Sequence, residues 1–259
     1  MRFLLTSLVV VIVSGCGGDD GGGDDDDDPP GVFDPAITEV RVEIDYETGQ
    51  APYTGPIIGF GDAFAISTAN LGRIFAGAKT VTLPTTTAAM QDLGAIADEE
   101  LTGDDLLAIA ADHRDQRSAG NVYTYYVVWV SGLFTDGSGP RPNVLAVSIG
   151  GTGVVAMFKD VIAGTGGVVP NVEKFVEQST LVHELGHAIG LVANGVATTS
   201  AHHDQAHGAH CTNDACVMYY LNEGAGDMAA FAQQYVTSGD AILFDAACLA
   251  DVDALTGGP

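Results

Sequence analysis

The pentapeptide His183-Glu184-Leu185-Gly186-His187 constrains this chain more than any other part of its sequence. Side chains four residues apart lie one turn apart on the same face of an α-helix, so a helix brings both imidazoles within reach of one metal ion. Glu184 then flanks that ion and can act as a base for water. The spacing therefore predicts a helix with a metal-binding face.

We expect this helix to run from about Pro170 to Ala193, followed by a stop at Asn194-Gly195, because glycine can adopt the left-handed conformation that closes a helix. Apolar and small residues at spacings of three and four continue the metal-binding face. Two histidines and a glutamate in this pattern favour a zinc hydrolase, and among hydrolases a peptidase. The stripe consists of Val172, Val176, Ser179, His183, His187 and Gly190.

The chain before this helix reads as alternating strands and helices. Residues 37–46 alternate in polarity, which predicts a half-buried strand, and residues 121–130 are rich in Tyr, Val and Trp, which predicts a central strand. The order of elements favours an α+β fold in which helices pack on a mixed, twisted sheet. Further helices are expected at 62–75 and 102–117, and further strands at 79–83, 144–149 and 154–158, the last two flanking a glycine-rich turn.

The N-terminus has the pattern of a secretory signal. An apolar run from Phe3 to Val13 follows Met1-Arg2 and is too short to span a bilayer. Its ending, Val13-Ser14-Gly15-Cys16, resembles the lipobox of bacterial lipoproteins. That resemblance implies a signal peptide over residues 1–16, a diacylated Cys16, and a cell-envelope protein anchored to a bacterial membrane. An ordinary secretory signal is the alternative.

Residues 17–35 are rich in Gly and Asp, so we expect an extended, disordered tether there, with one catalytic domain over residues 36–259. The formal net charge is −25. A charge of this sign excludes nucleic acid as an expected partner.

The residues around the pentapeptide resemble a known clan. His183-Glu184-x-x-His187-x-x-Gly190, with the later Met218, resembles the metzincin zinc peptidases, in which a methionine turn underlies the metal. Within this clan, the segment from His210-Cys211 to Cys216-Val217-Met218 resembles the archaemetzincin tail, and the chain is also similar to bacterial membrane metalloprotease lipoproteins. The resemblance covers residues 181–220. It implies a metzincin-like zinc peptidase domain with a long active-site helix.

The third zinc ligand departs from the metzincin pattern, because the expected position holds Ala193. The resemblance then implies a ligand from the following insertion: His210 first, since its spacing to Met218 fits the family, then His207, then His203. The expected zinc ligands are thus His183, His187 and His210. A thermolysin-like arrangement would instead recruit a downstream carboxylate, with Glu223 and Asp227 as candidates.

Three cysteines follow Cys16, and an odd number leaves one thiol unpaired in an oxidising compartment. We favour a disulfide between Cys211 and Cys216, with pairing of either to Cys248 open. Archaemetzincins hold a structural zinc with four cysteines, including a downstream Cys-x-x-Cys pair that this chain lacks. A second zinc is therefore in doubt, and Asp204 with spare histidines offers only a weak site.

Together these features predict a membrane-anchored zinc metalloendopeptidase and a monomer, with peptides or proteins as substrates. Glu184 is the expected general base, and the resemblance gives Tyr220 as the residue that stabilises the oxyanion. Tyr220 has packing as its alternative role. If the resemblance extends to substrate binding, the hairpin over residues 144–158 offers an edge strand to a peptide. The alternatives are a non-catalytic lipoprotein that captures zinc and a structural lipoprotein with a vestigial site.

Overall fold

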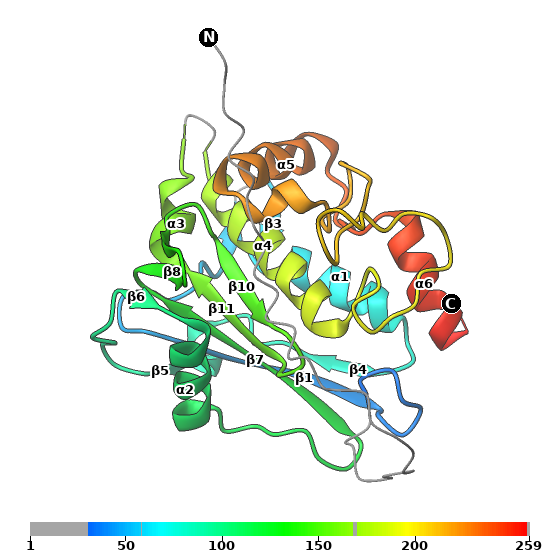
Figure 1. Ribbon diagram of the computed structural model, residues 1–259, viewed down its shortest axis with the longest axis horizontal. Coiled ribbons are helices and arrows are strands. Elements are labelled where there is room, and N and C mark those ends of the chain that lie inside the picture. The colour runs from blue at the N-terminus through cyan, green and yellow to red at the C-terminus, as the bar shows by residue number, and fades with distance from the viewer. Residues whose placement is uncertain (1–30, 58, 168–169, 258–259) are drawn as a thin grey trace.

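A mixed sheet of six strands forms the centre of the fold in the computed structural model, which describes residues 31–57, 59–167 and 170–257 (Figure 1). The strands of this sheet are β1 (Glu39–Tyr46), β4 (Thr80–Thr82), β5 (Gln91–Asp92), β7 (Val122–Val130), β10 (Ala146–Ile149) and β11 (Val154–Phe158). Their order is β10-β11-β7-β1-β4, and β5 also pairs with β1. All of these pairings are parallel except that of β10 with β11.

Helices cover both faces of this sheet, and α4 lies between the sheet and the C-terminal part of the chain (Figure 1). The helices are α1 (Ala65–Phe75), α2 (Gly103–His113), α3 (Lys159–Gly164), α4 (Val172–Ile189), α5 (Ala225–Ser238) and α6 (Ala246–Thr256), with short 3₁₀ helices η1 (Thr87–Ala89) and η2 (Tyr220–Glu223). Two small sheets complete the described elements: β2 (Pro56–Ile57) with β3 (Gly61–Asp62), and β6 (Glu100–Leu101) with β8 (Leu133–Asp136) and β9 (Gly139–Arg141).

Strand β7 divides the hydrophobic core into two parts, because successive side chains of a strand point to opposite faces. Tyr125, Val127 and Trp129 belong to the core under α1 and α4. The alternate residues Tyr126, Val128 and Val130 belong to the core under α2. Since both faces are covered, all six side chains are fully buried, and the prediction of a central strand is confirmed.

The mixed sheet with packed helices confirms the expected architecture, but several boundaries differ. The predicted helix over 62–75 begins at Ala65, and the strand predicted over 79–83 spans only β4. The hairpin is confirmed as β10 and β11. Helices α3, α5 and α6 were not anticipated from the sequence pattern.

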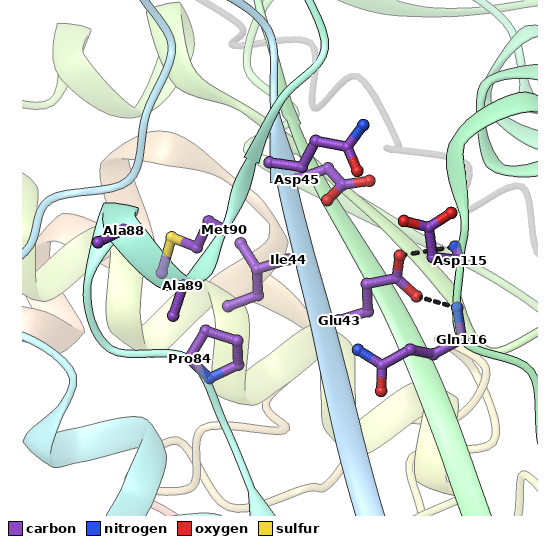
Figure 2. A pocket seen from close by; sticks show the side chains of 10 residues that line it. Glu43, Ile44, Asp45, Pro84, Ala88, Ala89, Met90, Asp115 and Gln116 are labelled. Carbon is purple, nitrogen blue, oxygen red and sulfur yellow. Dashed lines mark hydrogen bonds between the residues drawn. The ribbon is translucent and has the colours of Figure 1, made fainter.

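Helix α2 is shorter than predicted, because its C-terminal end is captured by a carboxylate from β1. The helix begins at the capping box formed by Thr102 and Asp105 but stops at His113 instead of continuing to residue 117. The backbone N–H groups of Asp115 and Gln116 each donate to the Glu43 carboxylate at 2.7 Å (Figure 2). These bonds direct the backbone away from the helix axis.

Glu43 and Asp45 also differ from the half-buried pattern expected of β1, since both are buried. They line a cavity of about 270 Å³ together with Met90 and Gln116 (Figure 2). Burial raises the pKa of Asp45 to about 6. The acidic face of β1 is thus covered by the connection that follows α2.

Helix α4 ends earlier than predicted, at Ile189, and Gly190 adopts the left-handed conformation with a φ of 98°. The stop expected at Asn194-Gly195 is therefore wrong. Helix α4 is also buried on nearly all sides, whereas the sequence pattern predicted one buried face. The reason is that α5 and η2 cover the side of α4 that faces away from the sheet.

Residues 1–30, with the predicted signal peptide, Cys16 and most of the predicted tether, lie outside the described residues. Within the described part, Val32 is already buried in the core, so packing begins before the predicted domain boundary at residue 36. No helix among the described residues combines the length and apolar character needed to span a bilayer.

A buried ion pair fixes the N-terminal half of α4. The Lys159 ammonium contacts the Glu177 carboxylate and lies 3.2 Å from the centre of the Tyr53 ring. Glu177 is fully buried and also accepts a hydrogen bond from the backbone N–H of Tyr53 at 2.7 Å. Both charges are therefore compensated inside the protein.

Replacement of Lys159 by Met should lower the free energy of unfolding by about 3–5 kcal/mol, because it leaves the Glu177 charge buried without a partner. The double variant Lys159→Met with Glu177→Gln should recover part of this loss. Urea unfolding monitored by circular dichroism measures both. A loss as small as that of the exposed control Arg41→Met would contradict a stabilising role for the pair.

Candidate metal centre

Helix α4 and the C-terminal segment bring three histidines together. The Nε2 atoms of His183 and His187 are 3.1 Å apart. The ring of His210 lies 5.4 Å from that of His183 and 4.8 Å from that of His187, measured between centroids. Of the three histidines considered for the third position, the structure places His210 in this group.

His203 and His207, the other two histidines considered for the third position, make contacts within the loop that carries His210. His203 Nε2 contacts the carbonyl oxygen of Gly208 at 2.8 Å. His207 Nδ1 contacts the Asp204 carboxylate at 2.7 Å. Asp204 is therefore engaged in the loop and not in a second zinc site of the kind considered from the sequence.

Backbone carbonyls orient two of the grouped histidines. His183 Nδ1 lies 2.7 Å from the carbonyl oxygen of Val217, and His210 Nδ1 lies 2.6 Å from that of His207. A carbonyl oxygen only accepts, so each Nδ1 carries the proton. In the neutral ring Nε2 is then left with a lone pair directed at the group, as a metal ligand requires.

Burial favours the neutral form of His183 and His187. It lowers the pKa of His183 to about 4, with a further contribution from the neighbouring His210, and it lowers the pKa of His187 well below its usual value. His210 Nε2 is buried and has no aligned hydrogen-bond partner among the described residues. These are the properties of imidazoles that fit a metal ion.

Glu223 joins the three histidines from η2. Its Oε1 atom lies 3.1 Å from His210 Nε2. One donor atom from each of the four residues lies within 4.8 Å of the others. The group as a whole could hold one metal ion, and Asp227 is not part of it.

Glu184 lies beside this group, buried against the edge of the sheet. The backbone N–H of Ser148 in β10 faces the Glu184 carboxylate and favours its charged form, which lowers the pKa. Burial raises its pKa to about 8, and the charge of Glu223 adds to the shift. A cation in the group would act in the opposite direction, because an adjacent positive charge stabilises the carboxylate.

Met218 packs directly against the metal-binding turn of α4. A Cβ atom at Gly186 would lie 2.5 Å from Met218 Sδ, so the absence of a side chain at Gly186 allows this contact. Met218 therefore lies against the turn of α4 that carries His183 and His187. Tyr220, expected near the reaction centre, is the first residue of η2, and its ring stacks on His207 with centroids 3.7 Å apart.

The three cysteines form a second cluster, and the predicted disulfide between Cys211 and Cys216 is not formed. Cys216 Sγ lies 3.6 Å from Cys248 Sγ. His202 Nδ1 lies 3.5 Å from Cys211 Sγ and 3.8 Å from Cys248 Sγ. Cys211 and Cys248 converge on His202 because the insertion folds back over α6, and Cys216 joins the cluster through Cys248.

This second cluster also has the composition of a metal site. His202, Cys211, Asp245 and Cys248 each offer a donor atom within 4.8 Å of the others. The second nitrogen of His202 lies 2.6 Å from Asp251, which directs Nδ1 toward the sulfurs. Hydrogen bonds from the neighbouring thiols lower the pKa of Cys211, which favours the thiolate that binds metal.

The sequence pattern did not predict this ligand set, because the chain has no downstream Cys-x-x-Cys pair and carries Asp245 three residues before Cys248 instead. Asp245 caps α6 and approaches Cys211 Sγ at 3.6 Å. The spacing of Asp245 and Cys248 was the available signal, but His202 could not be identified without the loop path.

No family model matches the chain, and no curated protein matches it. Among solved structures it is similar to an archaemetzincin from Methanopyrus kandleri, with 12% identity and a TM-score of 0.38 over 78% of this chain and 97% of that one. It is also similar to a zinc-dependent peptidase from Methanocorpusculum labreanum, with 12% identity and a TM-score of 0.44 over 82% and 99%. Neither likeness is close enough to assign an activity.

The left-handed turn at Gly190 separates α4 from the loop that supplies His210. A Cβ atom there would lie 2.8 Å from the backbone oxygen of Asn194. Gly190→Ala should therefore lower the free energy of unfolding by about 1–2 kcal/mol from the backbone conformation alone, and the clash adds to this loss. The substitution should also weaken zinc binding, because a distorted turn at residue 190 would displace the loop that carries His210.

Urea unfolding and zinc titration measure the two effects. The matched control is Gly72→Ala in α1, where a Cβ atom meets open space and the change should stabilise the protein by up to about 1 kcal/mol. Equal stability of the Gly190→Ala variant and the wild type would show that the turn is not strained by a side chain.

Proposed function

We propose that the protein is a zinc-dependent metalloendopeptidase in which His183, His187 and His210 hold the metal and Glu184 is the general base. The observation that carries this proposal is the convergence of three imidazoles beside a buried carboxylate. A site that only captures zinc has no need for Glu184 at this position. Its burial against β10 therefore favours hydrolysis over zinc capture and over a vestigial site.

Zinc, when bound, supplies a Lewis acid that polarises a carbonyl and lowers the pKa of water. A Glu184 carboxylate oxygen accepts the proton of the attacking water and delivers it to the nitrogen of the leaving amine. Tyr220 is proposed to donate to the developing oxyanion, supported only by its position two residues after Met218.

The edge of the sheet supports a peptide as the substrate. Strand β10 is the terminal strand in the sheet order, and its Ser148 contacts Glu184. An extended peptide that pairs with an edge strand gains backbone hydrogen bonds without demanding a particular sequence. A substrate bound along β10 would therefore pass beside the general base.

Glu184→Gln should lower peptide hydrolysis by on the order of 10²- to 10⁴-fold while zinc stays bound, because the amide cannot accept the proton. Hydrolysis of a quenched fluorescent peptide library and metal analysis measure the two quantities. Glu173→Gln, the same change in the first turn of α4, serves as the control. Hydrolysis by Glu184→Gln at the wild-type rate would exclude Glu184 as the base.

We further propose that the second cluster holds a structural zinc. His202, Cys211 and Cys248 supply three ligands, and Asp245 or Cys216 completes the four that zinc prefers. A metal there would tie the insertion to α6. Such a zinc would stabilise the fold and take no part in hydrolysis, because four protein ligands leave no coordination position for a substrate.

The purified domain should carry two zinc ions per chain, and Cys248→Ser should carry one and unfold at a lower temperature. Native mass spectrometry and thermal unfolding measure these outcomes. Thr86→Ala is the stability control, because Thr86 is exposed, remote in sequence from the cluster, and makes no side-chain cap hydrogen bond to η1. A wild-type domain with one zinc and freely reactive thiols would show that the cysteines merely pack.

A further inference from the structure

We propose that Glu223 is a fourth protein ligand of the histidine metal centre and that it closes this centre in the resting protein. The inference rests on the proposed function only in requiring a metal at the three histidines. It goes further because it makes access to the metal depend on one movable carboxylate. The argument begins with the contact between His210 and Glu223.

This contact joins two atoms that both carry lone pairs. His210 Nδ1 donates to the carbonyl oxygen of His207, so in the neutral ring Nε2 has no proton. Glu223 Oε1, at 3.1 Å, is a carboxylate oxygen that also accepts. The pair lacks the alignment of a hydrogen bond, since Nε2 has no hydrogen-bond partner among the described residues.

When both atoms carry lone pairs, they repel each other at this distance unless a proton or a metal cation lies between them. Metal–ligand bonds of about 2.0–2.1 Å place neighbouring ligands of a tetrahedral zinc roughly 3.3 Å apart. The His210–Glu223 separation of 3.1 Å is close to that value, as is the separation of 3.1 Å between His183 and His187. The four donors are thus arranged as co-ligands of one ion.

A hydrogen-bond network holds the backbone of η2, and thus the base of the Glu223 side chain, next to the histidines. The side chain of the preceding residue, Asn222, is buried and donates to the carbonyl oxygens of Cys216 and Val217 at 3.1 and 3.0 Å. Val217 is also the residue whose carbonyl accepts from His183. The carbonyl oxygen of Val217 therefore fixes the position of η2 relative to His183.

Exposure distinguishes Glu223 from His183 and His210, which are buried. His187 is also partly exposed, but it is fixed in α4. The side chain of His210 is fully buried, and that of Glu223 is 20% exposed. Glu223 thus lies on the solvent side of the group, at the end of η2 and directly before Gly224. It is the donor that can leave the metal without disturbing the core.

Four protein ligands have a clear chemical consequence. Structural zinc sites are closed by four protein ligands, whereas catalytic sites keep one position open. Turnover then requires Glu223 to withdraw, and the carboxylate acts as a latch that strengthens metal binding and restrains hydrolysis. Removing the latch should change these two properties in opposite directions.

The test compares Glu223→Gln and Glu223→Asp with the wild type. Zinc affinity is measured without substrate, by competition with a chromophoric chelator. Both variants should bind zinc about tenfold more weakly or worse, since even residues behind the ligands commonly contribute 10- to 100-fold. Glu223→Asp keeps the charge but shortens the side chain, so a loss in this variant reflects coordination and not the long-range field.

Asp227→Asn is the matched control, because Asp227 is an exposed carboxylate in the first turn of α5 and lies outside the donor group. It should bind zinc as the wild type does. Affinities of the two Glu223 variants equal to that of the control would overturn the ligand assignment.

Hydrolysis per bound zinc tests the latch. It should rise in Glu223→Gln relative to the wild type, measured with every protein saturated with zinc, and a fall would overturn the latch. A wild type that binds zinc but cleaves no peptide would refute the peptidase proposal alone, because the affinity comparison still decides whether Glu223 is a ligand.

Discussion

The carbonyl oxygen of Val217 joins the two halves of the metal centre. It accepts from the imidazole of His183 on α4 and from the side chain of Asn222, which precedes Glu223. The segment around it is anchored in turn, because the backbone N–H of Val217 donates to Leu243. A shift of this segment would therefore change the orientation of His183 and the position of Glu223 together.

The histidine group and the cysteine cluster share one short segment of the chain. His210 faces the histidine group, and the next residue, Cys211, faces the cysteine cluster. Backbone bridges pair Cys211 with His203 on one side and Tyr219 on the other. A metal held by the cysteines would thus stiffen the segment that presents His210, which gives the structural site a direct effect on the candidate catalytic one.

The acidic composition is used inside the fold as well as on its surface. Several carboxylates accept backbone N–H groups from distant loops: Glu43 from residues 115 and 116, Glu47 from Ile96 and Ser131, Glu177 from Tyr53, and Asp251 from Thr199. Hydrogen bonds to a carboxylate are stronger than those between neutral groups. In a chain with few basic residues, backbone donors take part of the role that salt bridges fill elsewhere.

Local pattern determined much of this protein. The spacing of His183, Glu184 and His187 follows from the period of a helix, and the Tyr, Val and Trp content of β7 is typical of a buried strand. The sequence by itself was therefore sufficient to predict a metal-binding helix on a mixed sheet. Only the tertiary structure decided which distant residues complete the site. His210 was one of three candidates, Glu223 was expected only as a replacement for it, and the thiols were expected to form a disulfide. The physical reason is that ligands converge through the path of a long insertion, whose fold depends on contacts with α4 and α6 and not on any local repeat.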